Sequence, residues 1–157
     1  MSVETKVQSF ETPSIGGTGG GAFNSNLNLD DKITGIRVHN GTVIDKIAFQ
    51  VNHNWMEGFG GKGGGKQEVV FSKDDYVTQI VCNGGTQLDH YVIASITFWL
   101  KSGKCASFRS EFKACITTPY APQPAPKYGE CKLVNVKGKC GAYVDSMTFE
   151  WIPVSDD

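Results

Sequence analysis

Three segments of the chain share one pattern of alternating polar and hydrophobic residues, and this repeat restricts the fold more than any other feature of the sequence. The segments are residues 45–51 (DKIAFQV), 94–100 (ASITFWL) and 145–151 (DSMTFEW), so the pattern returns about every fifty residues. In each copy the third, fifth and seventh positions are hydrophobic. Alternation of this kind is typical of a β-strand that buries one face.

The repeat predicts a fold built from three like units. One such unit is a small sheet that leaves its hydrophobic face in contact with water. Three sheets that face a common axis bury these faces together. The 19 glycines separate the strand-like segments, and nowhere do hydrophobic residues recur at helical spacing over ten residues. We therefore expect an all-β, three-sided prism. The alternative is a β-sandwich whose hairpins are similar by coincidence.

Length and charge exclude several classes of function. The chain has 157 residues, which suits one domain, and a formal net charge of −1, which gives no attraction to nucleic acid. The longest hydrophobic runs, such as residues 96–100, are too short to cross a bilayer, so we expect no membrane insertion. Residues 1–10 lack the hydrophobic stretch of a signal peptide. This predicts a cytoplasmic protein, or a secreted one if the sequence is a mature or recombinant form.

Five cysteines and three histidines are the side chains best suited to hold a transition metal. They form no C-x-x-C pair and are scattered, so we expect no metal and no cofactor. An odd number of cysteines leaves at least one thiol outside intrachain disulfides. The sequence leaves open one or two disulfides, or cysteines that act as small buried hydrophobic side chains. The cysteines are Cys82, Cys105, Cys115, Cys131 and Cys140.

Three stretches of the sequence resemble the jacalin-related lectin family, in its mannose- or glucose-binding type. They are residues 16–23 (GGTGGGAF), 33–47 (ITGIRVHNGTVIDKI) and 141–149 (GAYVDSMTF). The resemblance extends from about Ser14 to Trp151, which is nearly the whole chain. It rests on a glycine-rich loop near the start and a G-x-x-x-D loop near the end, in that order and in a strand context.

The resemblance implies both a fold and a function. The fold is a β-prism of three four-stranded antiparallel sheets with a pseudo-threefold internal repeat, spanning residues 14–153 between an N-terminal extension (1–13) and a C-terminal tail (154–157). The function is that of a lectin, not an enzyme, that binds glycans or glycoproteins without a metal. Family members commonly form dimers or tetramers, so a homo-oligomer is expected. The alternative is a β-prism that serves as a protein-interaction or structural module, with lost or altered sugar binding.

The chemistry of the two loops suits a sugar. An ionised Asp accepts hydrogen bonds from two adjacent hydroxyls of a hexose, and bonds to a charged acceptor are the stronger kind. Backbone N–H groups of a tight loop supply donors, and glycine lets a ligand approach the main chain. Without the resemblance, an alternative interpretation is that Asp145 stabilises its turn by accepting hydrogen bonds from the backbone of that turn. The resemblance assigns the primary site to Gly16, Gly17, Gly141, Ala142, Tyr143, Val144 and Asp145, with Tyr143 as a stacking face.

A second pair of such loops occurs earlier in the chain. Some family members use this pair as another mannose site. The equivalent residues here are Gly41, Val43, Ile44, Asp45, Gly60 and Gly61. Residues 40–42 (NGT) also form an N-glycosylation sequon, and a glycan on Asn40 would crowd this second site.

The third copy of the repeat lacks a complete site. Residues 85–89 (GTQLD) match the bare motif but lie out of register with their strand, and Ala94 stands where the other copies have Asp. The proline-rich run 118–126 stands where a glycine loop would face it. In the family, the longer loop at this place often borders the primary site. The resemblance therefore assigns a role in specificity to Gln87, Leu88, Asp89 and His90.

The position of the first glycine loop bears on the preferred sugar. Galactose-preferring members of the family have a cleaved chain whose new terminal glycine amine joins the site. Here fifteen residues precede Gly16, so no free amine is expected there without processing. The resemblance therefore favours mannose or glucose.

Three rival functions fit the sequence less well. Residues 60–66 have the spacing of a phosphate-binding loop, but Gln67 stands where Ser or Thr would hold magnesium. A hydrolase needs two carboxylates at one bond, whereas the prism separates Asp45 from Asp145. A third rival recognises anionic head groups, although scattered lysines usually form a solvated face. Its lysines would be Lys62, Lys66, Lys137 and Lys139.

Overall fold

The computed structural model describes residues 9–87, 89–109 and 129–154, and these residues form strands and turns with no helix. The strands are β1 (Phe10–Glu11), β2 (Ile15–Gly16), β3 (Gly21–Asn24), β4 (Ile33–Asn40), β5 (Ile44–Val51), β6 (Asn54–Trp55), β7 (Phe59–Gly60), β8 (Gly65–Val70), β9 (Val77–Gln87), β10 (His90–Leu100), β11 (Cys105–Phe108), β12 (Cys131–Cys140) and β13 (Val144–Pro153). These residues therefore contain no helix that is long and apolar enough to span a bilayer. The all-β expectation is confirmed.

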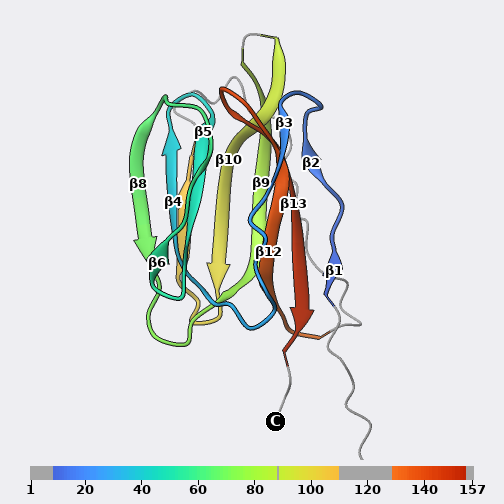
Figure 1. Cartoon of the computed structure of the whole chain (residues 1–157). Helices are drawn as coiled ribbons and strands as arrows, with labels where there is room; N and C mark the ends of the chain where they lie inside the picture. Colours follow the sequence, from blue (N-terminus) through green and yellow to red (C-terminus); the bar gives the residue numbers. More distant parts are fainter. Residues whose placement is uncertain (1–8, 88, 110–128, 155–157) are drawn as a thin grey trace, which may run out of the picture.

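The strands form three antiparallel sheets, each built around one long hairpin, β4–β5, β9–β10 or β12–β13 (Figure 1). The strand orders are β6-β5-β4-β8 with β7 also on β5, β11-β10-β9, and β1-β13-β12-β3 with β2 also on β13. β6 and β7 both pair with β5, and β1 and β2 both pair with β13. Each of these two pairs therefore acts as a single edge strand in two pieces. Two sheets therefore have the four strand positions expected of the prism. The sheet of β9, β10 and β11 has three among the described residues, and the proline-rich run 118–126 lies outside them.

Each long hairpin is bulged at the same place. The register shifts at Asp45 in the first hairpin, at Ala94 in the second and at Asp145 in the third. A bulge inserts one extra residue, bends its strand and changes the direction of a side chain. The three shifts confirm that Ala94 occupies the position that an acid occupies in the other two copies.

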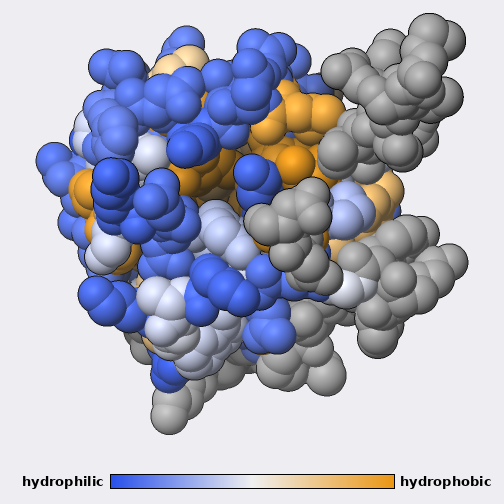
Figure 2. Space-filling view, turned by 90° about the horizontal axis from the view of Figure 1, so that it is seen from below, coloured by the Kyte–Doolittle hydropathy of each residue, from blue (hydrophilic) through white to orange (hydrophobic). Residues whose placement is uncertain are grey.

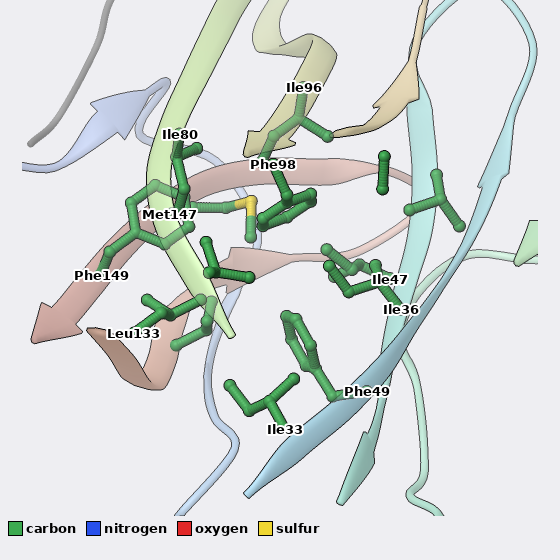
Figure 3. Close-up of a cluster of buried hydrophobic side chains, with 14 of the residues drawn as sticks. Ile33, Ile36, Ile47, Phe49, Ile80, Ile96, Phe98, Leu133, Met147 and Phe149 are labelled. Atoms are coloured by element: carbon green, nitrogen blue, oxygen red, sulfur yellow. The ribbon is translucent and has the colours of Figure 1, made fainter. Parts of the chain in front are cut away.

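The repeated hydrophobic positions meet on the axis of the prism. Figure 3 shows side chains from all three hairpins pointing toward one another, among them Ile47, Phe49, Ile96, Phe98, Met147 and Phe149. These six side chains are at most 1% exposed. Full burial of one such side chain stabilises a fold by about 1.5–3 kcal/mol. The predicted alternation is thus the pattern that builds the shared core.

The two ends of the prism differ. At the end with the hairpin turns, Tyr143 packs on a small buried cluster of Val43, Val92 and Ala94. At the opposite end, Figure 2 shows hydrophobic surface inside a hollow with a largely hydrophilic rim. A cavity of about 360 Å³ at that end is lined by residues of all three sheets, including Ile33, Val77 and Leu133.

The N-terminal residues are tied into the third sheet. In β1, Phe10 pairs with Trp151 of β13. Thr12 is buried, and its Oγ1 accepts a hydrogen bond of 3.1 Å from the indole Nε1 of Trp151. Residues that precede position 14, where the resemblance placed the start of the lectin domain, therefore contribute to the folded sheet.

The cysteines of the described residues differ in their surroundings. Cys82, Cys105 and Cys140 carry free thiols. Cys82 is fully buried in the core, and this burial raises the pKa of its thiol far above the ordinary value. Cys105 is exposed at the start of β11. Cys82 therefore matches the expectation of a small buried hydrophobic side chain, while Cys115 lies outside the described residues.

Candidate functional site

Two glycine-rich loops lie beside Asp45 and Asp145, the two acids at the bulges, and contact them in the same way. The amide of Gly17 donates a hydrogen bond of 2.8 Å to the carbonyl oxygen of Asp145, and the amide of Gly61 donates one of 2.8 Å to the carbonyl of Asp45. Each loop is thereby fixed to the strand that carries the acid. The loops are residues 16–21 (GGTGGG) and 60–65 (GGKGGG), which differ at a single position.

The first residue of each loop has to be glycine. Gly16 has φ +115° and Gly60 has φ +134°, a backbone region that residues with a Cβ rarely adopt. A Cβ on Gly16 would lie 2.3 Å from the carbonyl oxygen of Asp145, and one on Gly60 would lie 2.1 Å from that of Asp45. Both close approaches belong to the hydrogen-bonded contact between loop and strand.

The later glycines of each loop surround the carboxylate. A Cβ on Gly20 would lie 2.7 Å from Oδ1 of Asp145, and one on Gly64 would lie 2.6 Å from Oδ2 of Asp45. Gly19 and Gly63 approach the same two carboxylates. These four glycines were not predicted from the motifs, although the equal spacing of glycines in the two loops was a signal that could have identified them. Main chain therefore lies directly beside both carboxylates.

Burial sets the electrostatics of the two acids. Asp45 and Asp145 are 8% and 6% exposed. Burial raises the pKa of Asp145, and the nearby His90 opposes that rise. Burial likewise raises the pKa of Asp45, opposed by a hydrogen bond from the backbone of Gly41 and by the charge of His39. A carboxylate held away from water gains more from each hydrogen bond that a ligand donates to it.

The G-x-x-x-D loops form tight turns. The amide of Gly41 donates to the carbonyl of Val43 at 3.1 Å, and the amide of Gly141 donates to the carbonyl of Tyr143 at 2.9 Å. The same bond in both copies confirms that the two loops are structurally equivalent. These turns place the acid at the bulge that follows.

A cavity of about 460 Å³ opens beside Asp45. Its lining combines this copy of the repeat with the two others, since Gln87 comes from β9 and Tyr143 from the turn between β12 and β13. Tyr143, which the resemblance assigned to the Asp145 site, also lines this cavity beside Asp45. The lining residues are Gly41, Thr42, Val43, Asp45, Lys62, Gly63, Gly64, Gln87, Ala142 and Tyr143.

The two sites share a wall. Gly61 of the second loop packs so closely on the turn between β12 and β13 that a Cβ would lie 2.1 Å from the carbonyl oxygen of Ala142. The first loop packs in the same way on the β9–β10 hairpin, where a Cβ on Gly17 would lie 1.9 Å from the carbonyl oxygen of Tyr91. Each glycine loop therefore contacts the hairpin of a neighbouring repeat, and the structure brings residues predicted for both sites together.

The β9–β10 hairpin reaches both acids. Gln87 lines the cavity beside Asp45, and His90 lies close enough to Asp145 to act on its pKa. Asp89 is an exposed turn residue with φ 65°. Leu88, the fourth residue of the predicted specificity loop, lies outside the described residues.

The third copy of the motif does not form a comparable turn. Gly85 pairs with Val92, and Gln87 pairs with His90, so the hairpin continues as strand past the bulge. The extra strand length explains why the match at residues 85–89 is out of register. Among the residues that the structure describes, no group of three or more His, Cys, Asp or Glu is placed to hold a metal ion.

A family model for the jacalin-like lectin domain matches residues 12–150, which include both glycine loops and both acids. The chain belongs to the jacalin-like lectin family. In this jacalin-like lectin domain, the sheet that carries Asp145 extends beyond both bounds of the match, from Phe10 of β1 to Pro153 of β13. A search of curated proteins gives no significant match.

Solved lectin structures share the fold of this jacalin-like domain. Malaysian banana lectin has a TM-score of 0.77 at 19% identity, with 94% of this chain and 100% of that chain covered. A mannose-binding jacalin-related lectin from Ananas comosus has a TM-score of 0.76 at 20% identity, with 93% and 99% covered. Calsepa lectin in complex with a biantennary N-glycan has a TM-score of 0.74 at 21% identity, with 94% and 98% covered. The likeness extends over the whole β-prism.

Proposed function

We propose that the protein is a lectin that binds mannose- or glucose-type hexoses without a metal, at one site around Asp145 and another around Asp45. The observation that supports this most directly is the repeated geometry. Two buried carboxylates, in two copies of the same hairpin, are each enclosed by a glycine loop that bonds to the same strand. A turn-stabilising acid would not need such a loop beside it.

Binding follows from the groups at each site. The carboxylate accepts hydrogen bonds from two adjacent hydroxyls of the sugar. The glycines beside it leave room for the sugar ring to approach the main chain, whose N–H groups donate in return. At Asp45, the half-buried ring of Tyr143 adds a surface for the apolar face of the sugar.

Family members support the class of ligand. The Ananas comosus protein is described as mannose-binding, and the Calsepa lectin was solved with N-glycans. One hexose makes few hydrogen bonds, so we expect a dissociation constant on the order of 0.1–1 mM for each site. Two sites on one chain, or a dimer or tetramer of chains, would raise the avidity for a branched glycan.

The test is an NMR or calorimetric titration with methyl mannoside and methyl galactoside. Asp145→Ala and Asp45→Ala should each remove one site for the mannoside, and the double variant should bind neither sugar. Asp30→Ala, at an exposed acid that belongs to neither glycine loop and does not line the cavity beside Asp45, is the control for nonspecific effects of charge. Preference for galactoside would contradict the proposed specificity. A folded wild-type protein that binds no glycan would favour an interaction module instead.

A further inference from the structure

The two proposed sites differ most clearly at the middle of the glycine loop. The loops read GGTGGG and GGKGGG, so Lys62 stands where the other loop has Thr18. The main-chain bond from loop to strand is 2.8 Å in both cases, and the carboxylates are approached by equivalent glycines. A difference in ligand preference therefore has to come from side chains, and this exchange adds a positive charge to one site only.

Lys62 is placed to contact a ligand at Asp45. It is exposed and belongs to the lining of the 460 Å³ cavity beside that acid. Among the described residues, no ion pair joins Lys62 to the carboxylate of Asp45. Lys62 thus lines the cavity together with Asp45 without being paired to that acid.

The charge of Lys62 also has no other described partner. The ion pairs among the described residues join Arg37 to Glu68, Lys101 to Glu130 and Lys137 to Glu11. Lys66, the other lysine of this region, acts on the pKa of Glu68. Of the four lysines considered from the sequence, only Lys62 lines this cavity.

We propose that the Asp45 site selects hexoses that carry an anionic ester, a sulfate or a phosphate, and that Lys62 is the residue that determines this preference. The inference rests on the proposed lectin function. Asp45 accepts hydrogen bonds from two ring hydroxyls, and Lys62 binds an ester on a hydroxyl that Asp45 leaves free. The Asp145 site, with Thr18 in the equivalent place, lacks this cation and takes neutral hexoses.

The expected preference is modest, because Lys62 is exposed to water and salt. Exposed ion pairs change an equilibrium by up to about fivefold, so we expect about three- to fivefold tighter binding of the ester than of the neutral sugar. At the Asp145 site the same ester should bind more weakly than the neutral sugar, because Thr18 offers no positive charge to offset the repulsion that the carboxylate exerts at both sites. Salt weakens attraction between exposed charges, so the preference should shrink at high ionic strength.

The experiment uses the full chain with Asp145→Ala, which leaves the Asp45 site alone. NMR titrations compare methyl mannoside with its 2-, 3- and 6-sulfates and the corresponding phosphates. At least one ester should bind about three- to fivefold more tightly than methyl mannoside, and the better of the two ester types identifies the anion. Lys62→Thr should abolish this ratio. It reproduces the residue that the equivalent loop already contains, so the loop should keep its fold.

Two further variants separate the explanations. In the Asp45→Ala background, Thr18→Lys should transfer the ester preference to the Asp145 site. Lys66→Thr removes an exposed lysine outside the cavity lining and should leave the ratio unchanged. If Lys62→Thr leaves the ratio unchanged, or if no ester binds more tightly than methyl mannoside, the inference is wrong although the lectin function stands. If methyl mannoside does not bind either single-site protein, the proposed function itself fails.

Discussion

The amide of Gly17 donates a 2.8 Å hydrogen bond to the main-chain carbonyl of Asp145, the residue whose side chain we propose as the sugar acceptor. The position of the first glycine loop and the position of the carboxylate are therefore both set at Asp145, through its main chain and its side chain. Because this loop also packs on the carbonyl of Tyr91, its place depends on a hairpin from another repeat. The proposed site around Asp145 is thus assembled from two of the three units of the prism.

Gly17→Ala should disrupt this contact. The new Cβ would lie 1.9 Å from the carbonyl oxygen of Tyr91, so the loop or the hairpin must shift. We expect a loss of about 1–3 kcal/mol in the free energy of unfolding, measured with urea, and lost mannoside binding in an Asp45→Ala background. Gly21→Ala is the matched control, because its Cβ would meet Cys140 at an ordinary 4.0 Å. Normal binding by Gly17→Ala would show that the close packing is not required.

Sugar binding should weaken in mild acid. Burial raises the pKa of Asp45 and Asp145 above the usual 3.8, so both lose their charge at a higher pH than an ordinary aspartate. We expect mannoside affinity to fall as the pH drops through these raised pKa values, with the fold intact. A calorimetric titration from pH 7 downward measures this. Affinity that stays constant until the protein unfolds would contradict the role of an ionised carboxylate.

The same burial predicts a stability cost at neutral pH. The folded state holds the proton of Asp145 more tightly than the unfolded chain does, so this group favours folding at low pH and costs stability once the pH rises through its two pKa values. Asp145→Asn should raise the melting temperature by about 1–3 °C at pH 7 and by less near pH 3. Asp30→Asn, at an exposed position, should have little effect. A lower melting temperature at pH 7 would mean that the ionised carboxylate stabilises the loop.

Thr12→Val should destabilise the sheet that carries Asp145. Valine has the shape of threonine but removes the acceptor of the hydrogen bond from the buried indole of Trp151. An unsatisfied buried donor costs about 1–3 kcal/mol, measurable by urea unfolding followed by tryptophan fluorescence. Ser9→Ala, at an exposed position in the same segment, should change stability by less than about 0.5 kcal/mol. Equal effects of the two changes would show that the buried bond contributes little.

The thiols should react at very different rates with Ellman's reagent. Cys105 is exposed, whereas Cys82 is buried and its pKa is raised, so it has almost no reactive thiolate in the folded state. Cys105→Ser should remove one rapidly reacting thiol, and Cys82→Ser should leave the rapid phase unchanged. Rapid reaction that survives Cys105→Ser undiminished would contradict the exposure of that residue.

Much of the fold could be predicted because the signal is local. Alternation at Ile47, Phe49 and Val51 specifies a strand with one buried face, and its recurrence specifies like units around an axis. The absence of an acid at Ala94 was also visible from aligned copies, and the bulge in β10 confirms that position. Periodicity and motif spacing are properties of a short stretch of chain, so they can be recognised without knowing how the rest of the chain folds.

The sequence by itself determined the strand pattern, the threefold repeat and the two G-x-x-x-D loops with their glycine partners. Only the tertiary structure decided which residues share a cavity. Tyr143 belongs to the third repeat, with Asp145, but lines the space beside Asp45 of the first repeat. Gln87 reaches the same cavity from the second repeat. The physical reason is that the three units close around a common axis, so each glycine loop packs against the hairpin of a neighbouring unit. Such contacts between repeats depend on how the sheets pack against one another. This packing cannot be predicted from a local pattern of residues.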